Sequence, residues 1–141
     1  MKTNLAGVIT SNFESIEEAF PDVKHDREPL LSNYLVQVRR AKNTTKGGIV
    51  LPEDVRKSEA SNTTIAKVVG LGPLCFKNPH TLEPWPEGPS FKVGDFLQIP
   101  RYGGSRFSVP WKDEEVDFVL FDHLQQLARI TGDPRKITTY L

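Results

Sequence analysis

The chain contains a single cysteine, Cys75, and no long uninterrupted apolar run among its 141 residues. One thiol excludes an internal disulfide framework and any metal cluster that needs several thiolates. No stretch approaches the roughly 18 consecutive apolar residues of a membrane-spanning helix, and the first ten residues lack the basic flank and apolar core of a signal peptide. We therefore expect a cytoplasmic protein with one compact domain and tails.

An excess of charge of either sign is also absent, because 18 Lys and Arg residues balance 18 Asp and Glu residues. A domain whose surface neutralises phosphates is usually strongly basic, so this balance argues against general nucleic-acid binding. One local run is different: from Arg101 to Phe107, basic and aromatic residues interleave as they do on base-stacking surfaces. A solitary β-barrel that binds single-stranded nucleic acid is therefore the alternative function.

The sequence has no recognisable catalytic pattern. Its three histidines, His25, His80 and His123, lie far apart without metal-ligand spacing. Cys75 beside Phe76 is predicted to fill apolar space rather than to act as a nucleophile. The run 70–73, Gly-Leu-Gly-Pro, lacks the lysine and the helix of a phosphate-binding loop. We expect no enzyme activity, no catalytic residues, no metal and no cofactor.

Short segments of alternating polarity, divided by ten glycines and eleven prolines, dominate the sequence. Alternation with a period of two is typical of β-strands, and in the first such segment it places Tyr34, Val36 and Val38 on one face. The five predicted strands are residues 34–40, 64–69, 95–99, 106–109 and 115–121. The predicted fold class is all-β, a small barrel of antiparallel strands that hides its edges by closing on itself.

Three segments depart from the strand pattern, namely residues 1–28, 41–62 and 71–91. Residues 1–28 form an acidic extension in which Ser15-Ile16-Glu17-Glu18 predicts a capping box and a short helix through Phe20. Residues 71–91 hold five prolines and Trp85, which favours a stiff, extended excursion without helix or regular strand. We expect the barrel to span residues 29–130 and residues 131–141 to form a flexible C-terminal tail.

An apolar island stands inside the polar segment 41–62, which is predicted to be a long loop. Ile49, Val50 and Leu51 follow two glycines, Gly47 and Gly48, which free the backbone, and precede a proline that ends strand pairing. A buried strand is one interpretation of this pattern. The polar sequence on both sides favours the other, an exposed apolar segment that binds another protein.

Simple energetics indicate what kind of binding such a loop would support. Burying three aliphatic side chains contributes about 5 to 9 kcal/mol, whereas ordering loop residues costs about 1 to 2 kcal/mol for each one. A single loop would therefore bind weakly. Several loops on one assembly would bind well, because the first contact raises the effective concentration of the others. The pattern predicts a ring-shaped or otherwise multivalent assembly.

Four motifs occur in an order and spacing that resemble one family, the GroES-like co-chaperonins or chaperonin-10 family. Residues 46–53 resemble the mobile loop of that family, and 68–72, Val-Val-Gly-Leu-Gly, resemble the strand end that enters its roof hairpin. Residues 92–95, Lys-Val-Gly-Asp, resemble the turn that leaves the hairpin, and 102–105, Tyr-Gly-Gly-Ser, resemble the next turn. The resemblance covers roughly residues 29–130.

The resemblance implies a β-barrel subunit in a homoheptameric dome that caps a GroEL-like chaperonin in its nucleotide-bound state and encloses unfolded client proteins. Such a protein performs no bond chemistry. The implied chaperonin-binding residues are Gly47, Gly48, Ile49, Val50, Leu51 and Pro52. Trp85 would lie in the roof, where it packs against neighbouring subunits or faces the enclosed chamber, or else packs only on its own subunit.

Two further expectations concern the surroundings of the loop and the origin of the chain. Basic residues near the loop are predicted to steer it toward an acidic rim of the partner; these are Arg39, Arg40, Lys42 and Lys46. The acidic extension and the proline-rich roof segment depart from the common bacterial pattern. This divergence favours a phage-encoded relative that works in the cytoplasm of a bacterial host.

Overall fold

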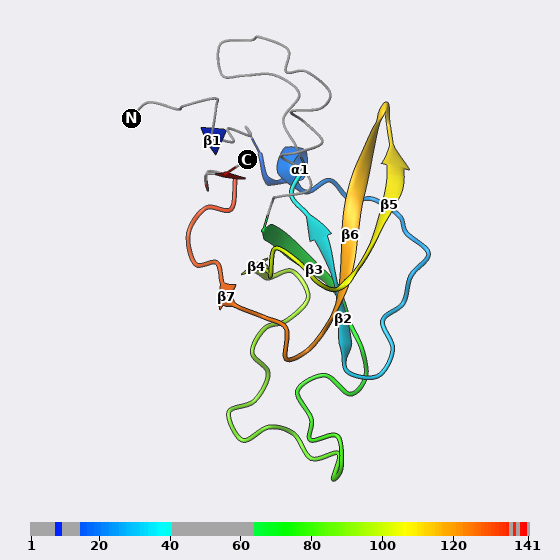
Figure 1. Cartoon of the computed structure of the whole chain (residues 1–141), viewed down its shortest axis with the longest axis vertical. Coiled ribbons are helices and arrows are strands. Elements are labelled where there is room, and N and C mark those ends of the chain that lie inside the picture. Colours follow the sequence, from blue (N-terminus) through cyan, green and yellow to red (C-terminus); the bar gives the residue numbers. More distant parts are fainter. Residues whose placement is uncertain (1–7, 10–14, 41–63, 136, 138, 141) are drawn as a thin grey trace.

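A computed structural model describes residues 8–9, 15–40, 64–135, 137 and 139–140 (Figure 1). Most of the described chain forms one antiparallel sheet with the strand order β5-β6-β2-β3-β4-β7, and β1 pairs with β8 in a separate two-stranded sheet. The strands are β1 (Val8–Ile9), β2 (Asn33–Val38), β3 (Ile65–Leu71), β4 (Phe96–Gln98), β5 (Ser105–Trp111), β6 (Glu114–Asp122), β7 (Ala128–Arg129) and β8 (Thr139–Tyr140).

This architecture confirms the predicted all-β fold class. Each of the five predicted strands is present as β2 to β6, with ends that differ by one or two residues from the prediction. Every strand pair within the large sheet is antiparallel, and β5 and β7 are its two outermost strands. The sheet curves into a barrel-like shape around one main apolar cluster.

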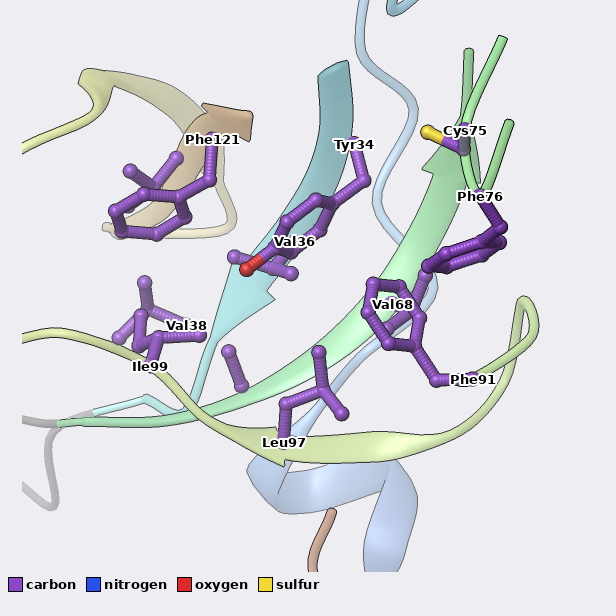
Figure 2. Close-up of a cluster of buried hydrophobic side chains, with 12 residues drawn as sticks. Tyr34, Val36, Val38, Val68, Cys75, Phe76, Phe91, Leu97, Ile99 and Phe121 are labelled. Carbon is purple, nitrogen blue, oxygen red and sulfur yellow. The ribbon is translucent and has the colours of Figure 1, made fainter. Parts of the chain in front are cut away.

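Every second side chain of β2 points to the inner face of the sheet and packs in the main apolar cluster. Tyr34, Val36 and Val38 are all at most 1% exposed, which confirms the face predicted from their spacing. Figure 2 shows them pointing toward side chains from β3, β4 and β6. The cluster is completed by Ala66, Val68, Cys75, Phe76, Phe91, Leu97, Ile99, Val119 and Phe121. Burial of these apolar side chains is the main source of stability for the sheet.

The outer face of β2 is buried as well, because the N-terminal segment covers it. Leu35 packs in a second cluster with Val23, Val116 and Phe118. The Gln37 side chain donates a hydrogen bond of 2.8 Å to the carbonyl of Pro21. A half-buried antiparallel strand would expose these two outward residues to solvent. Here β2 is instead a central strand enclosed on both sides.

We call residues 15–28 the strap, because they run along the outer face of the sheet toward the start of β2 (Figure 1). The His25 ring lies 5.1 Å from the ring of Phe118, and the Arg27 guanidinium lies 4.6 Å from the centre of the Phe107 ring. The buried strap residues Phe20, Pro21 and Val23 belong to the packed interior, whereas Arg27 makes its contact at the surface. Within the predicted acidic extension, this part belongs structurally to the barrel.

The strap begins with a one-turn helix, α1 (Ile16–Ala19), at the position that the sequence predicts. The Ser15 hydroxyl accepts a hydrogen bond of 3.1 Å from the Glu18 amide, as an N-cap residue does. The helix ends at Ala19, and its C-cap residue Phe20 is 2% exposed and packs against Phe96 and Ile65. So short a helix is held by this apolar contact rather than by its own hydrogen bonds.

The two connections that carry the predicted motifs leave the sheet at opposite ends. β2 ends and β3 begins at the end of the sheet that also holds α1 and the β5–β6 turn, whereas residues 72–95 join β3 to β4 at the other end (Figure 1). The segment after β7 also contacts the barrel: Pro134 is buried, and its carbonyl accepts a 2.9 Å hydrogen bond from the buried Arg39. Residues 139–140 pair with β1.

Gly104 should be intolerant of any side chain, because its backbone has φ +71° and a Cβ atom would lie 2.7 Å from both Phe121 and Val119. We expect Gly104→Ala to lower the free energy of unfolding by about 2 to 3 kcal/mol, combining a left-handed backbone with overpacking. Gly88→Ala is the matched control, since Gly88 has φ +77° but open space around it. Urea denaturation of both variants should show a loss of only about 1 kcal/mol for Gly88→Ala; equal losses would contradict the packing argument.

Candidate functional site

The predicted binding residues Gly47, Gly48, Ile49, Val50, Leu51 and Pro52 lie outside the described residues. The structure does describe the residues on either side of the 41–63 connection that contains them. The amide of Arg39 donates a 2.9 Å hydrogen bond to the carbonyl of Ile65, and the Ile99 amide donates a 2.8 Å bond to the carbonyl of Thr64. The 41–63 connection thus leaves from Arg40 and comes back at Thr64, and both positions adjoin hydrogen-bonded backbone.

Arg40 holds the first of these points to two other elements. Its amide donates to the carbonyl of Ala19 at 3.1 Å, and its Nη1 donates to the carbonyl of Glu18 at 2.7 Å. Its Nη2 forms an ion pair with Glu114, and its guanidinium carbon lies 4.6 Å from the centre of the Trp111 ring. Only 14% of the Arg40 side chain is exposed. Arg40 therefore connects the end of β2 to α1 and to the β5–β6 turn.

The prediction that Arg39 and Arg40 steer the loop toward a partner is wrong. Arg39 is 1% exposed and donates to the carbonyl of Pro134, while the charge of Arg40 is paired with Glu114. The buried guanidinium of Arg39 and the carboxylate-paired guanidinium of Arg40 add little to the field that an approaching partner meets. Lys42 and Lys46 lie outside the described residues. In the sequence, the arginines next to a polar loop gave no sign of these distant partners.

The proline-rich segment follows the predicted irregular path. Between residues 72 and 95, all of which the structure describes, the sole strand-like feature is an isolated bridge between Lys77 and Pro84. Its start is attached to the beginning of β2 and to the turn before it, because the Gly72 amide donates to the carbonyl of Asn33 at 2.8 Å and the Leu74 amide donates to that of Leu31 at 2.9 Å. The segment is thus extended but fixed at its root.

The segment ends in the turn 92–95 that the family motif predicts. Gly94 has φ +100°, and the Asp95 carboxylate accepts hydrogen bonds from both the side chain and the amide of Lys92, at 3.0 and 3.1 Å. These hydrogen bonds lower the pKa of Asp95 because they favour its charged form. The pairing closes the turn and brings the chain back into the sheet as β4.

Trp85, the predicted roof residue, packs on its own chain. Its ring centre lies 5.5 Å from that of Phe76 and 4.7 Å from that of His123, and the side chain is partly buried. His123 is 5% exposed, and its Nδ1 accepts a 2.9 Å hydrogen bond from the amide of Phe76. His123 is therefore a packing residue. Across the described part of the chain, His, Cys, Asp and Glu side chains form no group of three that could hold a metal ion.

Cys75 is a buried residue of the proline-rich segment 71–91. Its Sγ donates a hydrogen bond of 3.1 Å to the carbonyl of Asn33 in β2. Burial raises the pKa of this thiol above its ordinary value of 9.0 and raises the pKa of the neighbouring Tyr34 above 10.0. A thiol that stays protonated reacts slowly, because the thiolate is the nucleophile. This geometry supports the prediction of an apolar filler.

We expect Cys75 to react with a disulfide reagent at neutral pH much more slowly in the folded protein than in urea-unfolded protein. Because folding raises both pKa values, their contribution to stability is complete below pH 9.0 and declines as the pH rises through the folded-state values. A thiol assay in native and denaturing buffer measures the first effect, and alkaline unfolding measures the second. Equal reaction rates in both buffers would contradict the burial of Cys75.

The basic and aromatic run 101–107 is largely engaged within the hairpin of β5 and β6. Arg106 forms a 3.0 Å ion pair with Asp117, and Phe107 stacks on Phe118 with ring centres 5.3 Å apart. Tyr102 is 80% exposed, and the Arg101 guanidinium lies 6.0 Å from its ring centre. A stacking surface for nucleic acid needs several free aromatic faces. This arrangement leaves one exposed ring, which weakens the alternative function.

Comparison with known proteins gives a consistent result. A model of the family described as "Chaperonin 10 Kd subunit" matches residues 27–128. The 10 kDa mitochondrial heat shock protein of Saccharomyces cerevisiae is 36% identical over 106 residues, which cover 74% of this chain and 89% of the yeast protein. The corresponding protein of Oryzias latipes is 36% identical over 93 residues, covering 66% of this chain and 82% of the fish protein.

A bacterial relative, Co-chaperonin GroES 1 of Rhodopirellula baltica, is 36% identical over 87 residues, covering 61% of this chain and 77% of that protein. A phage origin stays a prediction. In the described ranges, no helix has the length and apolar character needed to cross a membrane. The match of residues 27–128 spans most of the barrel and all four motifs after the strap. The chain belongs to the chaperonin 10 kDa subunit family.

Proposed function

We propose that this protein is a co-chaperonin that caps an ATP-dependent chaperonin and assists the folding of enclosed client proteins. The family match over residues 27–128 is the observation that carries this proposal. The placement of the strands that flank the apolar island supports it, because β2 ends and β3 begins at the end of the barrel opposite the proline-rich segment (Figure 1). One end of the barrel would then contact the chaperonin while the other faces away.

The contact itself is assigned to residues 47–52. Ile49, Val50 and Leu51 dock into an apolar groove of the chaperonin, Gly47 and Gly48 permit the turn, and Pro52 limits the strand. Each docked loop contributes weak affinity, so a homo-oligomer, a heptamer by family resemblance, is needed for stable capping. Weak individual contacts also allow release when the nucleotide state of the chaperonin changes. The protein itself carries out no bond chemistry and works in the cytoplasm with its partner.

The roof is assigned to residues 71–91, with Trp85 in it. Its contacts with Phe76 and His123 favour a role in shaping its own subunit. Trp85→Ala separates this role from contact with neighbouring subunits. An altered oligomer mass or client range would indicate an intersubunit or chamber role, whereas an unchanged oligomer and client range would leave only the internal packing.

The function is tested by light-scattering chromatography of the purified protein with a bacterial chaperonin, run with ATP, with ADP and without nucleotide. We expect the free protein to migrate as a ring of 15.9 kDa subunits and to join the chaperonin peak only with nucleotide. A monomeric free protein that joins no chaperonin peak would refute the proposal. Salt-dependent retention on single-stranded DNA by that monomer would instead favour the solitary binding barrel.

A further inference from the structure

The strap lies almost entirely before the region that the family model matches, which starts at residue 27. Its helix α1 is nevertheless packed at the point where the 41–63 connection leaves the sheet. Ala19 is fully buried and Phe20 is 2% exposed, and both share a cluster with Ile65, the first residue of β3. Helix α1, which precedes the matched region, therefore lies beside the base of the proposed docking loop.

Arg40 donates hydrogen bonds to the C-terminal end of helix α1. The last carbonyls of a helix have no donors within the helix and need partners from elsewhere. Arg40 supplies donors for two of these carbonyls, because its Nη1 donates to the carbonyl of Glu18 and its amide donates to the carbonyl of Ala19. Positive charge at a helix C-terminus is also favourable. The backbone of residue 40 is thereby fixed by α1 as well as by the strand it follows.

Glu114 fixes the other side of the same guanidinium. It begins β6, its side chain is 22% exposed, and it pairs with Nη2 of Arg40. The face of Trp111 covers the guanidinium at 4.6 Å, a distance within the range of cation–π attraction. A partly enclosed pair with several contacts holds its geometry better than an exposed surface pair. Arg40 is thus held by groups on both sides.

We propose that Arg40, held by α1 and Glu114, is a positioning residue for chaperonin binding that fixes the departure point of the docking loop. This inference rests on the proposed function. A loop whose first residue is already ordered loses less conformational entropy when it docks. The packing of Ala19 and Phe20 on Ile65 extends the effect to the return point. The strap then contributes to chaperonin affinity without touching the chaperonin.

The test compares Arg40→Ala with Arg106→Ala. Arg106 lies on β5 and also pairs with a carboxylate, that of Asp117 on β6 at 3.0 Å, but this pair bridges the two strands of the β5–β6 hairpin rather than the base of the loop. We expect Arg40→Ala to raise the dissociation constant of the nucleotide-dependent chaperonin complex by at least about tenfold, because ordering one more residue already costs about tenfold in one loop and the cost recurs in every docked loop. Arg106→Ala should stay within about twofold, as is typical of a surface ion pair.

Glu114→Gln keeps the proposal testable if Arg40→Ala does not fold. Glu114→Gln removes the negative charge that pairs with Arg40 and keeps the shape of the side chain, so we expect chaperonin binding to be about threefold weaker. The oligomer mass and melting temperature should equal those of Arg106→Ala. A purely structural role would not separate affinity from melting temperature in this way. Chaperonin affinities of Arg40→Ala and Glu114→Gln equal to that of Arg106→Ala would overturn the inference while the function stands. A wild-type protein that binds no chaperonin would overturn both.

Discussion

Ile49→Asp should abolish capping of a chaperonin while leaving the free oligomer intact. In the proposed complex, Ile49 enters an apolar groove, where a carboxylate would lose its water without gaining a partner. The penalty recurs in every subunit, so multivalent binding magnifies the loss rather than compensating for it. Light-scattering chromatography with ATP should show the variant eluting apart from the chaperonin, at the mass of the wild-type ring.

Ser58→Asp is the matched control for Ile49→Asp. It adds the same charge within the same connection but outside the apolar island. We expect it to cap the chaperonin with an affinity close to that of the wild-type protein. If Ile49→Asp still caps, the assignment of the docking residues is wrong. If both variants lose capping equally, net charge rather than the apolar contact of Ile49 determines binding.

The period of two along the chain predicts much of this fold because it reports directly on one buried face. Tyr34, Val36 and Val38 alternate and meet in the main cluster, as expected of a strand with one side inward. The helix start at Ser15 was also visible, since a hydroxyl three residues before an acidic residue is a local signal. Such features depend on neighbours in sequence, and the sequence displays them.

The second buried face could not be predicted in the same way. Leu35 and Gln37 occupy the outward positions of β2, and nothing near them in sequence shows that Pro21 and Val23 cover them. Arg40 presents the same difficulty, because its partner Glu114 lies 74 positions away and belongs to another hairpin. Contacts of this kind follow from tertiary packing, which can place an arginine expected at the surface inside a network. The apolar island Ile49–Leu51 is the reverse case, recognisable in sequence but outside the described residues.

Phe20→Ala should show how far the strap stabilises the barrel. The Phe20 ring is 2% exposed, lies 5.0 Å from the ring of Phe96 and shares a cluster with Ile65. Its removal deletes buried apolar area and leaves a cavity, so we expect the free energy of unfolding to fall by about 3 to 5 kcal/mol. Urea denaturation measures the loss as a lower midpoint at an unchanged slope.

Tyr102→Ala is the aromatic control for this measurement, because Tyr102 is 80% exposed and should change stability by less than about 0.5 kcal/mol. Equal small losses in both variants would mean that the strap does not belong to the folded core. A large loss for Phe20→Ala alone has a wider consequence. A chain cut at residue 27, where the family match starts, would keep every family motif and still lack the cover of its second face. With that outcome, the folding unit would begin before the family domain, at the helix that also holds Arg40.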